Sequence, residues 1–132
     1  MRSREVRRKL WKRQKQLYLD EWALQVMTVQ ADRIDEERVA CVRDYQPGVP
    51  GARIEIACAC SDEDVSNSCT HEVCHVRMAD MHFAFERALQ SLSDAEAQAH
   101  REAYTQAEER AVVAFTDLIE RLETAAARAE ED

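Results

Sequence analysis

Alternation of apolar and polar residues marks three short stretches in the first half of the chain. Trp22–Val29 begins with the period-two pattern of a half-buried strand. Arg38–Tyr45 and Arg53–Cys58 are two further strand candidates, separated by the loop Pro47–Gly51. Because the connections are short, the three stretches predict a small antiparallel sheet.

The second half of the chain has the pattern of helices. Ser61, with an acid three residues later, is a capping signature for a helix from Asp62 to Leu89, which is apolar on several sides and therefore expected to be central and buried. Ser93 repeats this signature and opens a long helix that reaches about Ala129. Its predicted apolar stripe consists of Tyr104, Ala111, Val112, Phe115, Leu118, Ile119 and Leu122.

Length and composition predict one α+β domain. The chain has 132 residues, 45% of them hydrophobic and 33% charged, which suits a single globular core. We expect a sheet of about three strands packed on a central helix and on the long C-terminal helix. The domain is predicted to span residues 17–128, after a basic helix or arm at 1–16 and before an acidic tail at 129–132.

The charge of the chain is unevenly distributed. The net charge is −8, yet residues 1–16 contain eight Lys and Arg and a single acid. Such a segment can contact nucleic acid or, as we prefer, pair with the acidic body of the protein. No apolar run is long enough to span a bilayer or to form a signal-peptide core, so we expect a cytoplasmic protein without a membrane partner.

The strongest chemical motif is HEVCH at residues 71–75, which fits H-E-x-x-H. On a helix, His71 and His75 lie one turn apart on one face and can bind one zinc ion, with Glu72 beside it as general base. The metal would polarise a substrate carbonyl and acidify its bound water, and the glutamate would accept the proton of that water.

A zinc site of this kind needs a third protein ligand. His82 lies about 10 Å along the helix from His75, too far to share the metal. Glu108 falls inside the apolar stripe of the last helix, where a carboxylate is costly unless it is paired or bound to metal, and Glu109 lies beside it. Either glutamate is a candidate ligand. Tyr104, one turn before Glu108, is a candidate hydrogen-bond donor to an oxyanion, although core packing is its simpler role.

These residues resemble a family of small zincin-like proteins encoded by bacteriophages and prophages. The resemblance covers residues 17–122 and depends mainly on HEVCH, with a preceding strand at 52–56 and the later sequence Glu108–Val112. It implies a minimal zincin-like metallopeptidase in the host cytoplasm, with His71, His75 and Glu108 or Glu109 as zinc ligands and Glu72 as the base. Cys74 departs from the apolar residue that such helices usually carry.

The cysteines support a different hypothesis. Cys58, Cys60, Cys69 and His71 fit C-x-C-x8-C-x-H, which is similar to a SWIM-type zinc finger that binds DNA or protein. If the helix begins at Ser61, however, Cys69 and His71 point to opposite sides and cannot bind one metal. We therefore favour the zincin-like site, in which the cysteines are small buried residues.

Three functions follow from these patterns. The preferred one is hydrolysis of a peptide bond in a peptide or protein substrate, with the strand Arg53–Ala59 as the rail for an extended substrate. The second is a zinc finger, to which the basic N-terminal segment would add contacts with nucleic acid. The third is an inactive zincin fold with a structural role. The sequence does not indicate the oligomeric state.

Overall fold

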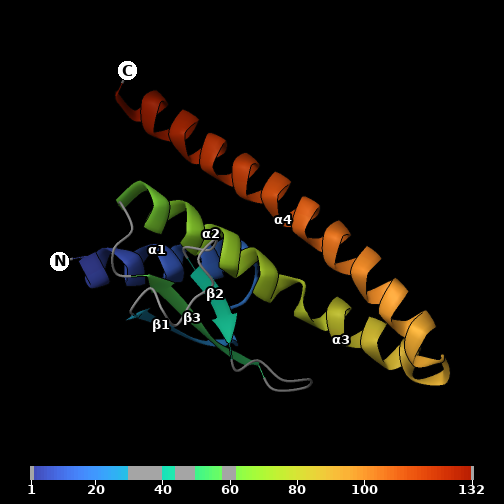
Figure 1. The fold of residues 1–132 in the computed structure, drawn as a ribbon. Coiled ribbons are helices and arrows are strands. Elements are labelled where there is room, and N and C mark those ends of the chain that lie inside the picture. The colour runs from blue at the N-terminus through green and yellow to red at the C-terminus, as the bar shows by residue number, and fades with distance from the viewer. Residues whose placement is uncertain (1, 30–39, 44–49, 58–61, 132) are drawn as a thin grey trace.

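The computed structural model describes residues 2–29, 40–43, 50–57 and 62–131 (Figure 1). A small sheet and a set of helices follow one another in the chain, as the α+β prediction requires. In order they are α1 (Arg2–Gln16), β1 (Ala23–Val29), β2 (Ala40–Arg43), β3 (Gly51–Ala57), α2 (Asp62–Arg77), α3 (Ala79–Ala88), the 3-10 turn η2 (Leu89–Ser91) and α4 (Asp94–Glu131).

The sheet has the strand order β1-β3-β2 and is mixed, so the prediction of a purely antiparallel sheet is wrong. β1 pairs with β3 in parallel, with Ala23 opposite Gly51, whereas β2 pairs with β3 antiparallel, with Ala40 opposite Ile56. Alternation of apolar residues determines which face of a strand is buried but not which strand lies beside it.

The central position of β3 also contradicts the predicted substrate rail. Both edges of β3 are paired, with β1 along Gly51–Ala57 and with β2 along Arg53–Ile56. A substrate strand can add only to an edge with free backbone groups. Residues 53–57 therefore do not offer a rail, and residues 58–59 lie outside the described part of the chain.

The helices α1 and α2 pack together against the sheet, and α4 crosses the outside of α2 (Figure 1). Apolar side chains from α1, β3 and α2 form one core, whose fully or nearly fully buried members include Val6, Leu10, Ile54, Ile56, Val73 and Val76. The basic N-terminal segment is thus a helix that contributes to the core.

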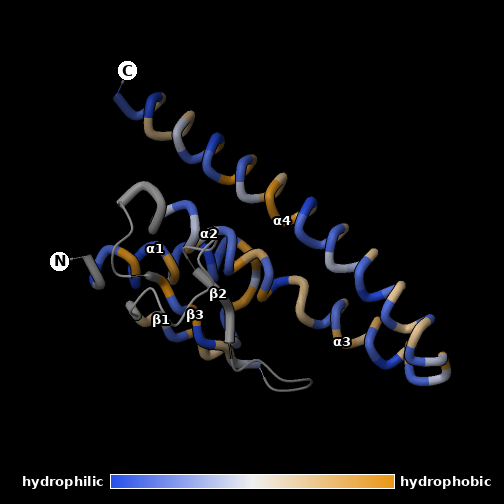
Figure 2. The backbone as a smooth tube through the Cα atoms, viewed as in Figure 1, coloured by the Kyte–Doolittle hydropathy of each residue, from blue (hydrophilic) through white to orange (hydrophobic). Residues whose placement is uncertain are grey.

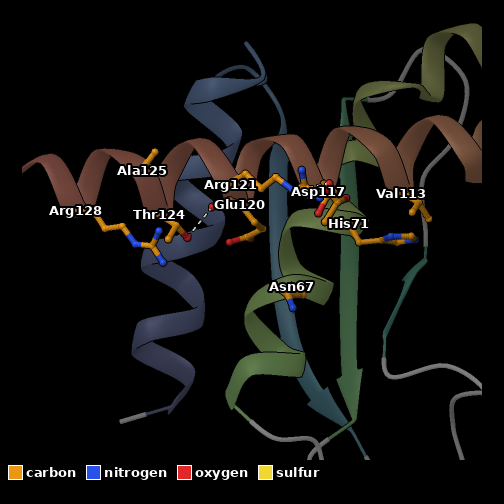
Figure 3. A pocket seen from close by; sticks show the side chains of 10 residues that line it. Asn67, His71, Val113, Asp117, Glu120, Arg121, Thr124, Ala125 and Arg128 are labelled. Carbon is orange, nitrogen blue, oxygen red and sulfur yellow. Dashed lines mark hydrogen bonds and ion pairs between the residues drawn. The ribbon is translucent and has the colours of Figure 1, made fainter.

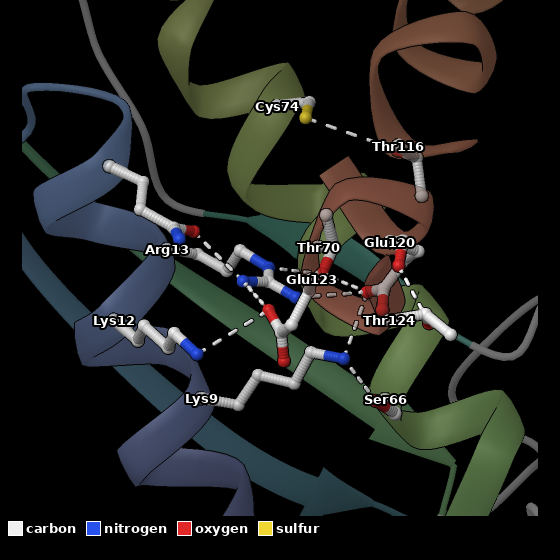
Figure 4. Close-up of polar contacts among 11 residues, drawn as sticks. Lys9, Lys12, Arg13, Ser66, Thr70, Cys74, Thr116, Glu120, Glu123 and Thr124 are labelled. Carbon is white, nitrogen blue, oxygen red and sulfur yellow. Dashed lines mark hydrogen bonds and ion pairs between the residues drawn. The ribbon is translucent and has the colours of Figure 1, made fainter. Parts of the chain in front are cut away.

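A cluster of ion pairs joins α1 to α4 (Figure 4). The side chain of Arg13 is fully buried and donates to Thr70 Oγ1 at 2.8 Å, while its guanidinium pairs with Glu120 at 3.3 Å and with Glu123. Lys9 also pairs with Glu120, at 2.8 Å. For these residues the structure confirms the prediction that the basic segment pairs with the acidic body.

The long central helix predicted for Asp62–Leu89 is interrupted at Met78. The backbone there has φ −90° and ψ 1°, and the Met78 amide is shared between the carbonyls of Cys74 and His75. No proline or glycine marks this position, so the sequence carries no signal for the break. The capping signature at Ser61 lies outside the described residues.

The start of α4 agrees with its predicted capping box. The Glu96 amide donates to Ser93 Oγ at 3.3 Å, and the Ser93 amide donates to the Glu96 carboxylate at 3.4 Å. None of the helices in the described part of the chain has the length and apolar character needed to cross a membrane.

The apolar stripe predicted for α4 is only partly buried. Val112 is fully buried, but Phe115, Leu118 and Leu122 are each more than half exposed. Figure 2 shows apolar positions recurring among hydrophilic ones along α4. Because α4 meets the rest of the protein mainly along α2, only a narrow strip of the helix can be buried.

Candidate metal centre

The two motif histidines project from α2 towards α4. His71 and His75 are both half-buried, and their Nε2 atoms lie 3.2 Å apart. Their rings are edge-on, with centroids separated by 4.9 Å. The spacing of one helical turn therefore brings two imidazole nitrogens to a single point, as the motif predicts.

Glu109 of α4 completes a group of three at this point. Its Oε1 lies 3.0 Å from His71 Nε2, and its Oε2 lies 3.0 Å from His75 Nε2. The donor atoms of the three residues all lie within 4.8 Å of one another. Neighbouring ligands of a tetrahedral zinc ion are roughly 3.4 Å apart when the bonds are 2.0–2.1 Å long. The donor set and its spacing fit a zinc ion after a small outward adjustment.

Glu108 has a different partner from Glu109. Its Oε2 accepts a hydrogen bond from His75 Nδ1 at 3.0 Å, and its Oε1 accepts one from the Tyr104 hydroxyl at 3.1 Å. A carboxylate on Nδ1 fixes the ring orientation and the tautomer of a histidine whose Nε2 binds metal. The two adjacent glutamates thus contact different atoms: Glu109 contacts the Nε2 atoms of both histidines, and Glu108 contacts Nδ1 on the other side of the His75 ring.

Electrostatics at the site are governed by these contacts. Burial alone would lower the pKa of His75, but the Glu108 hydrogen bond and the negative charges of Glu72 and Glu109 raise it. Burial would likewise raise the pKa of Glu108, but its hydrogen bonds and the nearby charge of His75 lower it. These contacts therefore shift the pKa of His75 towards its protonated form and the pKa of Glu108 towards its ionised form.

Glu72, the predicted general base, is 7% exposed on α2. Its charge contributes to the raised pKa of His75, so its carboxylate lies within electrostatic range of the metal-binding point. Glu72 is nevertheless not a member of the ligand-capable group found among the described residues.

Two other predicted residues lie in an aromatic cluster next to the site. The Tyr104 ring stacks on Phe85 with centroids 4.6 Å apart, and the His82 ring is tilted against Tyr104 at 5.4 Å. His82 therefore packs against Tyr104 and is not in the group that could hold a metal, as the helix geometry predicted. Sequence reasoning missed that Tyr104 reaches Glu108.

The described cysteine side chains are free thiols in buried positions. Cys69 is fully buried in the core, where burial raises the pKa of its thiol to about 11. Cys74 is 3% exposed and accepts a hydrogen bond from Thr116 at 3.9 Å. Cys58 and Cys60 of the predicted finger lie outside the described residues. Cys69 faces the core while His71 faces α4, so these two do not share a ligand point.

An open groove adjoins the candidate metal centre. It lies between α2 and α4, has a volume of about 720 Å³, and has His71 among its lining residues (Figure 3). Sequence reasoning gave no sign of it, because it depends on how α4 crosses α2.

No protein-family model, curated protein or solved structure matches the chain. The chemistry of the site is therefore inferred from its geometry.

Proposed function

We propose that the chain is a zinc-dependent peptide hydrolase in which His71, His75 and Glu109 bind the ion and Glu72 is the general base. The observation that carries the proposal is the meeting of two Nε2 atoms and one carboxylate, with separations of 3.0–3.2 Å. Three protein ligands leave one position for water or substrate, as in catalytic zinc sites.

Each surrounding residue has a role in this proposal. Zinc would supply an acidified water and polarise the substrate carbonyl. Glu72, which follows His71 on α2, would accept a proton from that water, the role of the glutamate in the H-E-x-x-H motif. Glu108, supported by the Tyr104 hydroxyl, would keep the proton on His75 Nδ1 so that Nε2 faces the metal.

The order of elements supports a minimal zincin-like fold for this enzyme. A strand precedes the H-E-x-x-H helix, and a glutamate-bearing helix follows it, as in the small phage-type family that the sequence resembles. The mixed sheet and the central position of β3 depart from the antiparallel sheet and substrate strand expected of that fold. These departures leave the proposed site intact, because its residues come from α2 and α4. A cytoplasmic location, in the host cell for a phage protein, belongs to the same proposal.

The cysteine spacing Cys58-x-Cys60-x8-Cys69-x-His71 keeps a zinc-finger function as the second candidate. Such a module would bind DNA or protein, and exposed Arg4, Arg7 and Arg8 of α1 would add salt-dependent contacts to nucleic acid. The finger needs Cys69 to leave the core and turn towards the side of His71.

Elemental analysis of zinc in protein purified without added metal tests both candidates. We expect about one zinc per chain in the wild type and in Cys60→Ala, and loss of zinc in His75→Ala and Glu109→Ala. Glu72→Gln should retain zinc but lose hydrolysis of an unstructured protein such as casein. Zinc lost from Cys60→Ala and kept by Glu109→Ala would instead establish the finger, and a wild type without zinc would refute both sites.

A further inference from the structure

The groove beside the metal centre has the dimensions of a peptide site. Residues from Val113 to Arg128 of α4 line it, and this interval of fifteen residues spans about 22 Å along the helix axis. An extended segment of about six or seven residues has the same length. The volume of about 720 Å³ is also within the usual range for ligand sites, about 300–1,000 Å³.

The groove begins at the candidate metal centre. His71 lines it and also contacts Glu109, so the metal-binding point lies at one end (Figure 3). From there the groove continues along α4, with Asn67 of α2 on the opposite wall. β3 has no free edge for a substrate strand, whereas this groove adjoins the metal-binding point directly.

Two arginines give the far part of the groove its charge. Arg121 and Arg128 lie seven residues apart on α4, which places them on one side of the helix and about 10 Å apart along its axis. Within the described ranges, Arg128 has no ion pair. Arg121 pairs with Asp117 at 3.0 Å, but both side chains are largely exposed, so little energy opposes exchange of this partner.

The remaining acid in the groove is already neutralised from the other side. Glu120 accepts a hydrogen bond from Thr70 at 2.6 Å and pairs with Lys9 and Arg13. Its negative charge is thus matched by the basic residues of α1. Arg128, and Arg121 where it exchanges Asp117 for a substrate acid, are thus the cations of the groove that can attract negative charge on a bound chain.

We propose that this groove binds an extended peptide segment with acidic side chains at Arg121 and Arg128. Measured from Glu109, the two arginines lie about 18 and 28 Å along the helix. Alternate side chains of an extended chain face opposite ways, so acidic side chains about five and nine residues from the bond at the metal would share the face towards both arginines. The inference rests on the proposed function, because the positions of the peptide are counted from the bond at the metal. Binding of the acidic segment, however, can be measured without hydrolysis.

Fluorescence polarisation with two labelled peptides tests the groove. One ten-residue peptide of alanine and serine carries glutamate at positions five and nine, which face the same side of an extended chain, and its twin carries glutamine there. On the zinc-loaded full chain with Glu72→Gln, which prevents cleavage, the glutamate peptide should bind about fivefold more tightly, as expected for two exposed ion pairs. Added salt should reduce the difference.

A pair of charge reversals provides the control. Arg128→Glu should remove most of the preference for the glutamate peptide. Arg87→Glu makes the same change of charge at an exposed position of α3, away from the groove, and should leave the preference in place. Circular dichroism of both variants would confirm that the fold is intact.

The outcomes separate this inference from the proposed function. Equal affinity for the two peptides, no binding of either, or equal effects of the two reversals would overturn the acidic-peptide groove, even for a protein that binds zinc and cleaves peptides. A preference that depends on Arg128, together with a wild type that neither retains zinc on purification nor cleaves casein, would establish the groove and refute the hydrolase.

Discussion

Arg13 offers the most direct test of how α4 is held on the protein. Its guanidinium is fully buried and contacts Thr70, Gln16, Glu120 and Glu123, so it joins α1, α2 and α4 at one point. Substitution by methionine keeps most of the volume of the side chain but removes the charge and every hydrogen bond.

The loss of unfolding free energy in Arg13→Met depends on the carboxylates that the substitution leaves without their buried partner. Removing one partner of a fully buried ion pair typically costs about 3–5 kcal/mol, because the other charge stays buried without compensation. Here Glu120 and Glu123 are 25% and 34% exposed, and Lys9 and Lys12 remain beside them. We therefore expect the low end of the range, about 3 kcal/mol of unfolding free energy.

Urea denaturation followed by circular dichroism measures this change. With a denaturant slope of about 2 kcal/mol per molar, the midpoint should fall by about 1.5 M. Lys12→Met is the matched control, since Lys12 is 53% exposed and pairs with Glu123 at 3.6 Å. Such an exposed pair contributes about 0–1 kcal/mol, so the midpoint should move by less than about 0.5 M.

Equal midpoint shifts for Arg13→Met and Lys12→Met would refute the reasoning, because burial would then have no effect on the cost. The double variant Arg13→Met with Glu120→Gln provides a second check. If the two side chains form one network, the double variant should lose less than the sum of the single losses. Strict additivity would show that they act independently.

Three further predictions concern the site and the charges around it. Glu108→Ala should weaken zinc binding by about 10–100-fold in a chelator competition, whereas complete loss of zinc would make Glu108 a ligand. Cys69, with its thiol pKa raised to about 11 by burial, should react with a disulfide reagent at pH 8 roughly a hundredfold more slowly in the native than in the unfolded chain. Rapid native labelling would contradict its burial. Burial raises the pKa values of Glu120 and Glu123, but hydrogen bonds and the charges of basic side chains on α1 lower them overall. In urea denaturation at a series of pH values, the stability advantage of the wild type over Arg13→Met should therefore be complete above pH 4.5 and decline below it.

The sheet illustrates how far periodicity determines a fold. The three predicted strand regions contain β1, β2 and β3 within a few residues, because alternating apolar positions are a local property. Pairing depends on contacts between distant residues, such as Ala23 with Gly51, for which one sequence carries no pattern. The three strands of the described sheet could therefore be predicted, while the parallel pairing of β1 and β3 could not.

The long helix α4 shows a similar limit. Its start and approximate length follow from the capping box at Ser93 and the absence of breakers. Its apolar positions suggested one buried stripe, but Val112 is buried while Leu122 is 62% exposed. Helical periodicity predicts which face of α4 is apolar, but the extent to which that face is buried depends on the size of the neighbouring surface it packs against.

The adjacent glutamates Glu108 and Glu109 show why the candidate metal ligand could not be chosen from the sequence alone. An inward carboxylate needs a partner, and this rule correctly marked Glu108, whose partners are His75 Nδ1 and the Tyr104 hydroxyl. It did not favour Glu109, which is half exposed yet contacts both Nε2 atoms. A hydrolytic metal must be reached by water and substrate, so the half-exposed Glu109 suits the proposed ligand role better than Glu108, which is hydrogen-bonded behind His75. Exposure of a carboxylate is therefore no argument against ligation where the proposed chemistry itself requires an open side.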